Sequence, residues 1–161
     1  MRLRACMEPT ELAPGIVATG PIPRKTDFEQ VPQHFLTDGP DGSGHVQDLL
    51  EDDQALILEQ RNAPPILVLG CSHSGIVNTL LHAAELTRTS RFSLVIGGTH
   101  LIDADESRLE KTLETLRRFE IGRIAPCHCT GPGGQFALWK RYGASFLPIS
   151  TGDRIECAGW R

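Results

Sequence analysis

The sequence lacks the features that mark membrane proteins and nucleic-acid-binding proteins. Its longest apolar run, residues 66–69 with their flanks, is far shorter than the ~20 residues that a membrane-spanning helix needs. The first nine residues contain no apolar core of a secretory signal. Sixteen Lys and Arg against twenty Asp and Glu give a net charge of −4, so there is no basic excess to bind a phosphate backbone. The sequence therefore predicts a cytoplasmic protein that binds neither membranes nor nucleic acid.

The cysteines do not form a pattern typical of disulfides. There are five, an odd number, and their spacing matches no secreted scaffold. We therefore expect reduced thiols, which are available as metal ligands or as small buried side chains.

The length and composition of the chain predict one globular domain. The chain has 161 residues, of which 40% are hydrophobic and 22% charged, and this length leaves no room for a second catalytic domain.

The first part of the chain has little predicted secondary structure. Prolines interrupt every candidate helix up to residue 44, and only residues 15–19 resemble a strand. Irregular segments of this length are uncommon inside a domain. We expect residues 1–50 to form a Pro- and Gly-rich segment that is either a covering loop or lacks its packing partner. Residues 51–161 are expected to form the folded part.

From residue 54 onward, apolar periodicity predicts alternating strands and helices. Predicted strands lie at 55–58, 66–69, 92–96, 123–126, 145–149 and 154–157, and predicted helices at 76–86, 109–119 and 135–142. Helical connections between strands are right-handed crossovers, which make the connected strands parallel. The fold class is therefore α/β, a mixed sheet with a βαβαβ core.

Three of the predicted strands are each followed by a histidine. The segments are Gly70-Cys71-Ser72-His73, Gly97-Gly98-Thr99-His100 and Cys127-His128-Cys129-Thr130. Because the carboxyl ends of parallel strands lie at one edge of a sheet, these segments should meet in space. Imidazole and thiolate are preferred ligands of Zn²⁺ and of other transition metals. His73, His100 and His128 are the predicted metal ligands; the alternative is that each is a hydrogen-bonded histidine at a strand end.

The cysteines in these segments allow more than one interpretation. Cys71 and Cys127 are candidate site-lining or catalytic thiols, although each also fits a small buried side chain. A redox role for Cys127 and Cys129 needs thiols of low pKa. The single residue between these two differs from the spacing of zinc knuckles, which argues against a closed structural zinc site.

Two predicted helix starts adjoin the histidines and offer free backbone N–H groups to an anion. Ser74 and Gly75 form one of them, and Thr130 and Gly131 form the other. These four residues are candidate contacts for an anionic small-molecule substrate; ordinary capping and turn formation are the alternative. Arg24 and Lys25 either approach the same anion or belong to the solvated surface.

Five collinear segments resemble one protein family. They are TGPIPRKTDFE at 19–29, EDDQALIL at 51–58, GCSHSGIVNT at 70–79, GGTHL at 97–101 and APCHCTG at 125–131. Together they resemble a branch of the metallo-β-lactamase-fold hydrolases that includes 7,8-dihydropterin-6-methyl-4-(β-D-ribofuranosyl)aminobenzene-5′-phosphate synthases. The resemblance runs from about residue 15 to the C-terminus.

The resemblance implies an αββα sandwich with one or two metal ions, usually zinc, at one edge. In that family a metal-activated water attacks an ester, amide or phosphoester. By similarity, His128 takes the place of the last ligand histidine, and His73 and His100 lie near the second metal. The resemblance leaves open whether Cys71 or His73 replaces the bridging aspartate. It implies a phosphorylated or pterin-like substrate, with either hydrolase or synthase-type transferase chemistry.

The family's HxHxDH motif is missing from this sequence, in which no two histidines are separated by one residue. The resemblance therefore covers only the C-terminal part of the fold. Three explanations arise: a truncated gene, a split subunit, or a non-catalytic ligand-binding remnant. We favour truncation, and expect a chain that is inactive alone. A chain that forms only one half of the αββα sandwich would expose an apolar face of its sheet. We therefore also expect this face to be covered, either in an oligomer or by a second chain that supplies the other half.

Overall fold

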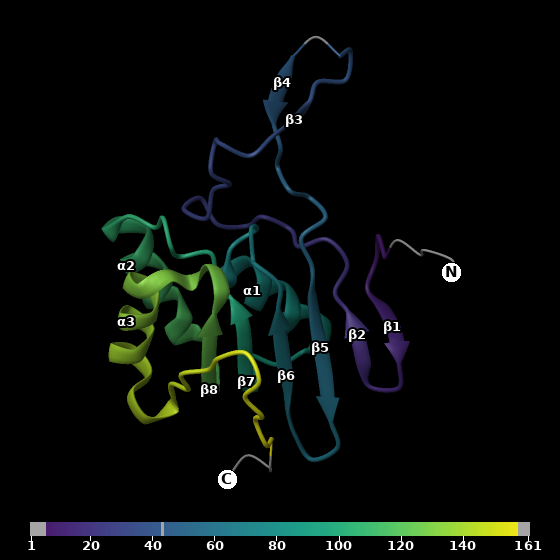
Figure 1. Cartoon of the computed structure of the whole chain (residues 1–161). Coiled ribbons are helices and arrows are strands. Elements are labelled where there is room, and N and C mark those ends of the chain that lie inside the picture. Colours follow the sequence, from purple (N-terminus) through teal and green to yellow (C-terminus); the bar gives the residue numbers. More distant parts are fainter. Residues whose placement is uncertain (1–5, 43, 158–161) are drawn as a thin grey trace.

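The computed structural model describes residues 6–42 and 44–157 (Figure 1). Its main sheet has six strands in the order β1-β2-β5-β6-β7-β8. The strands are β1 (Thr10–Ala13), β2 (Ile16–Ala18), β5 (Ala55–Gln60), β6 (Ala63–Leu69), β7 (Arg91–Gly98) and β8 (Glu120–Cys127). The helices are α1 (Ile76–Thr87), α2 (Glu106–Thr115) and α3 (Gly131–Tyr142), with short 3₁₀ turns η1 (Leu116–Arg118), η2 (His128–Thr130) and η3 (Gly143–Ser145).

The sheet is mixed, which confirms the predicted fold class. Strands β1, β2, β5 and β6 pair antiparallel, whereas β6, β7 and β8 pair parallel. Helix α1 connects β6 to β7, and α2 with η1 connects β7 to β8. These two crossovers form the expected βαβαβ core, and they direct the carboxyl ends of three neighbouring strands to the same edge of the sheet (Figure 1).

One face of the sheet is covered by helices, with α1 behind the sheet in Figure 1. Fully buried side chains of the strands, such as Leu67 and Val95, pack there against Leu80 of α1 and Leu138 of α3. Burying a side chain of this size stabilises the fold by about 1.5–3 kcal/mol. This core fixes the three parallel strands and thereby the loops that follow them.

The opposite face of the sheet is partly covered by the C-terminal segment, which crosses it in yellow in Figure 1. Leu147, Ile149 and Ile155 pack against the buried pair Ile66 and Leu94. The strands predicted at 145–149 and 154–157 do not form, apart from one bridge between Ile124 and Phe146. Pro148 comes two residues after Phe146 and has no N–H to donate to a neighbouring strand. The apolar face is therefore half-buried rather than fully exposed.

Two further strands, β3 (Leu36–Asp38) and β4 (His45–Gln47), form a separate hairpin. The hairpin projects beyond the edge of the sheet at which the parallel strands end (Figure 1). Leu36 is 57% exposed and Val46 46% exposed. Sequence periodicity did not predict these strands, because three-residue strands exposed on both faces carry no alternating apolar pattern.

No helix in the described part of the chain is long and apolar enough to cross a membrane.

Candidate metal and ligand site

The three predicted segments lie together at the carboxyl edge of the sheet. β7 pairs with β8 up to Gly98 opposite Cys127, and the N–H of Gly98 donates to the carbonyl oxygen of Gly70 at 2.9 Å. The loop after β6, the loop after β7 and the turn η2 after β8 therefore start side by side. Residues that are some 30 to 60 positions apart in sequence become neighbours here.

Cys71, His128 and Cys129 form a compact group at this edge. Their ligand atoms all lie within 4.8 Å of one another, with the histidine exposed and both cysteines half-buried. The Cys129 Sγ accepts the N–H of His100 at 3.3 Å and donates to the Cys71 carbonyl oxygen at 3.2 Å. Two thiols and one imidazole at this separation are a donor set that can hold a transition metal.

Sequence reasoning missed Cys129 as a member of this group. Because it is one position beyond His128, alternation along a strand would point the two side chains in opposite directions. The chain instead turns into η2 at His128, and the turn brings both side chains to the same side. Cys127, the last residue of β8, is not part of the three-residue group found among the described residues.

His73 and His100 form a second pair beside the first group. Their rings meet edge-on with centroids 4.7 Å apart, and Phe35 covers both at 5.3 and 6.0 Å. Phe35 precedes the β3–β4 hairpin, so the N-terminal segment does reach over the strand ends. The three predicted histidines are thus divided, with His128 beside the cysteines and His73 with His100 under an aromatic ring.

The His100 side chain makes no hydrogen bond within the described part of the chain. Its residue is only 8% exposed, and neither ring nitrogen has a hydrogen-bond partner among the described residues. Burial lowers the pKa of His100, and the neighbouring His73 and Arg108 lower it further. The ring is therefore neutral near pH 7, with one nitrogen able to accept a hydrogen bond or bind a metal.

The backbone at the three strand ends is strained. Ser72, His100 and His128 have φ angles of 56°, 47° and 51°, in the left-handed region that non-glycine residues rarely adopt. Each such residue costs of order 1 kcal/mol and persists only where its surroundings fix it. Ser72 is held by its hydroxyl, which donates to the Gly98 carbonyl oxygen at 2.9 Å. Strain of this kind clusters at functional sites.

Gly98 allows Cys129 to approach the strand ends. A Cβ atom at this position would lie 2.7 Å from Cys129 Sγ and 2.7 Å from the Gly70 carbonyl oxygen. Both distances are shorter than ordinary contacts, and the second is to backbone, which cannot rotate away. The glycine therefore keeps β6, β7 and η2 close enough for the thiols to meet.

Replacing Gly98 with alanine is expected to destabilise the chain by about 1–3 kcal/mol, the usual cost of overpacking a close-packed interior. Urea-induced unfolding measures the change. Gly133→Ala in α3 is the matched control, because an added Cβ there meets nothing within 4 Å and alanine favours a helix. Equal stability of the Gly98→Ala variant and the unchanged chain would contradict the close packing described here.

The thiols of Cys127 and Cys129 are protonated at neutral pH when no metal is bound. Burial raises the pKa of Cys129 to about 11, and burial also raises the pKa of Cys127, with Cys71 adding to it. Redox-active cysteines need a low pKa. The environment of Cys127 and Cys129 is the opposite of that which a redox role requires.

The start of α1 already holds an anion, the carboxylate of Glu29. The N–H of Val77 donates to Glu29 Oε1 at 2.9 Å, and the N–H of Asn78 donates to Oε2 at 2.8 Å. A Cβ at Gly75 would lie 2.1 Å from the Glu29 side chain, so only glycine fits beneath the carboxylate. The helix dipole and free N–H groups that were expected to bind a substrate anion bind this buried glutamate instead.

The other predicted anion contacts are also used within the chain. The N–H of Ser74 donates to Asp53 Oδ2 at 2.8 Å. The Thr130 hydroxyl donates to the Cys127 carbonyl oxygen at 2.7 Å and accepts from Thr99 at 3.0 Å. Gly131 is buried, and a Cβ there would lie 2.8 Å from the Cα of Ile102. The predicted contacts thus serve mainly to tie the strand ends together.

Two arginines lie beside the histidine pair. Arg24 donates to the carbonyl oxygens of His73, at 3.1 Å, and Leu49. Arg108, on α2, donates to the carbonyl oxygen of His100 at 3.3 Å. Lys25 instead pairs with Glu85 at 2.5 Å on the surface. Arg108 was not found from the sequence, because it sits in a helix whose other charged residues face solvent.

No protein-family model matches the chain. Among curated proteins it is 32% identical over 151 residues to 7,8-dihydropterin-6-methyl-4-(β-D-ribofuranosyl)-aminobenzene-5′-phosphate synthase of Methanocaldococcus jannaschii. That match covers 92% of this chain and 51% of the synthase. An uncharacterized protein of the same organism is 32% identical over 124 residues, which cover 77% of this chain and 43% of that protein.

Among solved structures the chain is similar to Tm1679, described as a metal-dependent hydrolase of the β-lactamase superfamily. The TM-score is 0.81 at 26% sequence identity, over 92% of this chain and 56% of Tm1679. The chain thus spans about half the length of the curated relatives it matches.

Proposed function

Because the chain has the fold of part of a metallo-β-lactamase-superfamily hydrolase, we propose that it is the metal-binding portion of a metal-dependent hydrolase. The single observation that carries the proposal is the group of Cys71, His128 and Cys129 at the strand ends. Its position at the carboxyl edge of parallel strands is where α/β folds place their ligands.

The proposed metal is zinc, because its preferred ligands in proteins are cysteine sulfur and histidine nitrogen. Three protein ligands leave a coordination position open, as in catalytic rather than structural zinc sites. When bound, such a metal supplies Lewis-acid chemistry and lowers the pKa of a coordinated water. His73 and His100, next to Cys129, are available as further ligands or as hydrogen-bonding groups.

The proposed substrate class is a small phosphorylated molecule. The curated relative is named for a dihydropterin-linked ribofuranosyl 5′-phosphate, which suggests a phosphorylated or pterin-like substrate here. The half-buried Arg24 and the nearby Arg108 support this proposal, because guanidinium groups favour phosphate oxygens. The neutral His100, whose carbonyl oxygen binds Arg108, can accept a hydrogen bond from such a substrate.

We propose that the remaining ligands come from a complementary half outside this sequence. The HxHxDH motif is absent from the chain, and the chain matches about half of each curated relative. The half-buried apolar side chains Leu58, Val68 and Ile96 on the open sheet face offer a surface for that half. The same observations favour a second candidate, a metal- and ligand-binding protein without turnover.

Hydrolysis of bis(4-nitrophenyl) phosphate by the zinc-loaded chain tests the proposal. The assay is run alone and with the part of the archaeal synthase that this chain does not match. We expect one zinc per chain and hydrolysis that needs the added half and is lost on zinc removal. Zinc binding with no turnover in either mixture would favour the second candidate. Failure to bind zinc at all would contradict both.

A further inference from the structure

A cavity with a volume of about 1140 Å³ lies away from the strand ends, between α2 and α3. Its apolar lining consists of Phe28, Leu109, Leu113, Phe136 and Ala137. We refer to it as the α2–α3 groove. The histidines and cysteines of the proposed metal site do not line it, so it has a separate role.

Aromatic side chains stand exposed beside the groove. Phe136 is 63% exposed and Trp139 is 53% exposed, and their rings lie 5.8 Å apart on the outer side of α3. Aromatic residues of this kind are enriched at the centres of protein interfaces and bury 150–250 Å² each when covered. The pair forms an apolar patch continuous with the groove, because Phe136 lines it as well.

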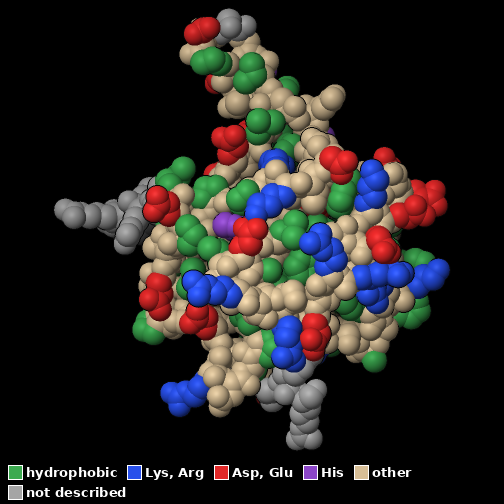
Figure 2. Space-filling model, turned by 180° about the vertical axis from the view of Figure 1, so that it is seen from behind, with side chains coloured by type: hydrophobic (Ala, Val, Ile, Leu, Met, Phe, Trp, Pro, Cys, Tyr) green, Lys and Arg blue, Asp and Glu red, His purple; other side chains and the backbone are tan. Residues whose placement is uncertain are grey.

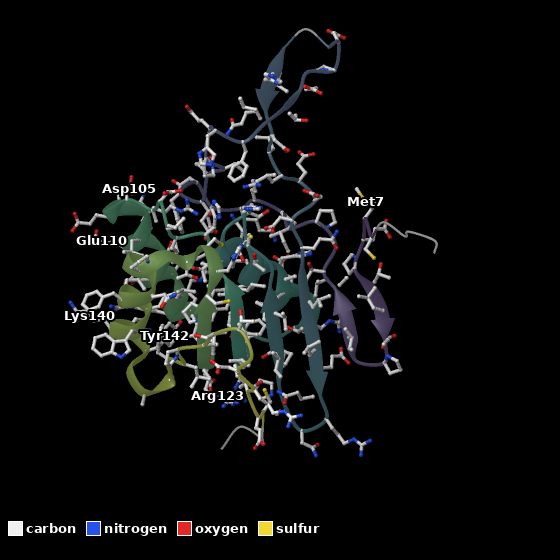
Figure 3. All side chains as sticks on the ribbon, in the orientation of Figure 1. Met7, Asp105, Glu110, Arg123, Lys140 and Tyr142 are labelled. Atoms are coloured by element: carbon white, nitrogen blue, oxygen red, sulfur yellow. The ribbon has the colours of Figure 1, made fainter. Side chains whose placement is uncertain are left out.

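The two sides of the groove carry opposite net charges. Glu106, Glu110 and Glu114 outnumber Lys111 on the α2 side, whereas Lys140 and Arg141 line the groove from the last turn of α3. Arg117 of η1 also lines the groove, where it is paired with Glu114. Figure 3 shows Glu110 and Lys140 pointing outward on the same side of the molecule. Figure 2 shows acidic and basic side chains together on the right of the rear face, around hydrophobic ones.

Most of these charges are unpaired within the described part of the chain. Glu114 is bound by Arg117 at 3.2 Å. Ion pairs among the described residues involve neither Glu110 nor Lys140, and the Arg141 guanidinium lies over the Tyr142 ring at 5.4 Å. An apolar lining between one side of net negative charge and one side of net positive charge is complementary to a copy of itself turned by half a revolution about the long axis of the groove.

We propose that the α2–α3 groove is the interface of a two-fold symmetric dimer of this chain. In the dimer, Glu110 of one chain faces Lys140 of the other, and the same contact repeats across the axis. Phe136 and Trp139 of each chain cover the groove of its partner. The charges favour a second copy, because the half-turn places the basic side of one chain over the acidic side of the other at both contacts.

Sedimentation velocity over a range of concentrations tests the proposal with single charge reversals. Glu110→Lys and Lys140→Glu are each expected to weaken self-association at least about tenfold, because each places like charges opposite each other twice. An equimolar mixture of the two variants is expected to recover dimers, since every contact is then between opposite charges. Glu59→Lys, at an exposed position of β5 outside the groove, is the control and should leave association unchanged.

Three results would overturn the proposal. They are a chain that stays monomeric at all concentrations, dimers that persist in both single variants, and a mixture that fails to recover them. Circular dichroism confirms that each variant is folded, as expected for exposed side chains. A Phe136→Ser variant provides a second readout, because it removes the apolar contact without changing any charge, and it too should weaken association at least about tenfold.

Discussion

Replacing Glu29 with alanine is expected to lower the free energy of unfolding by about 2–4 kcal/mol, a large part of the stability of a small domain. The side chain is 1% exposed and accepts hydrogen bonds from the N–H groups of Val77 and Asn78 and from the hydroxyl of Thr26. Without the carboxylate, two buried N–H groups at the start of α1 have no acceptor, and each costs about 1–3 kcal/mol.

The expected loss of stability is smaller than the summed contribution of these hydrogen bonds, because burying a carboxylate is itself unfavourable. Burial raises the pKa of Glu29, although the hydrogen bonds from Val77, Asn78 and Thr26 act to lower it. Unfolding in urea measures the difference at pH 7. Glu59→Ala, at an exposed position of β5, is the control and should change stability by less than about 0.5 kcal/mol. Similar stabilities for the two variants would contradict the anchoring role of Glu29.

Glu29 also connects the N-terminal segment to the proposed metal site. Its carboxylate lies against Gly75, four residues after Cys71 and two after His73. Losing the carboxylate frees the loop that carries both side chains. We therefore expect the Glu29→Ala variant to bind zinc more weakly than the unchanged chain, even at temperatures where it remains folded.

Replacing His128 with alanine is expected to lower zinc affinity at least about 100-fold, more than is usual for losing a group that only orients a ligand. The His128 nitrogen is the one imidazole donor in the group with Cys71 and Cys129. Its side chain is exposed, so the substitution removes a ligand without opening a cavity in the core. Competition with a chromophoric zinc chelator measures the affinity.

Matched variants separate ligand loss from general damage. His45→Ala alters an exposed histidine of the β3–β4 hairpin, and Cys157→Ser alters a cysteine beside the C-terminal segment. Both should retain zinc affinity, whereas Cys129→Ser should weaken it about as much as His128→Ala does. Zinc affinity that is unchanged in the His128 variant, or reduced equally in the His45 control, would contradict the assignment of the ligands.

The sequence was sufficient to predict the part of the fold in which secondary structure follows apolar periodicity. Strands β5 to β8 and their helices have buried faces, so their patterns are clear, and the rule for parallel strands brings His73, His100 and His128 to one edge. The separation of His128 from the other two histidines was not predictable, because it depends on the turn η2 and on left-handed backbone at His100 and His128.

Long-range contacts account for the other differences. Glu29 reaches the start of α1 from 48 residues away, and no local pattern identifies a glutamate that binds a helix terminus so far along the chain. Similarly, Phe35 covers His73 and His100 from an irregular segment with no periodicity. The residues expected to bind an external anion, Ser74 and Gly75, were correctly placed at a helix start, but the tertiary fold fills that position with Glu29.

X-ray absorption spectroscopy at the zinc edge tests whether Cys71, His128 and Cys129 bind the metal, because it reports the atoms coordinated to zinc. Two sulfur ligands at about 2.3 Å and nitrogen or oxygen ligands at about 2.0–2.1 Å are expected in the zinc-loaded chain. One sulfur should be lost in the Cys129→Ser variant. A zinc environment of nitrogen and oxygen alone, or a purified chain that takes up no zinc, would contradict the claim that Cys71, His128 and Cys129 hold the metal.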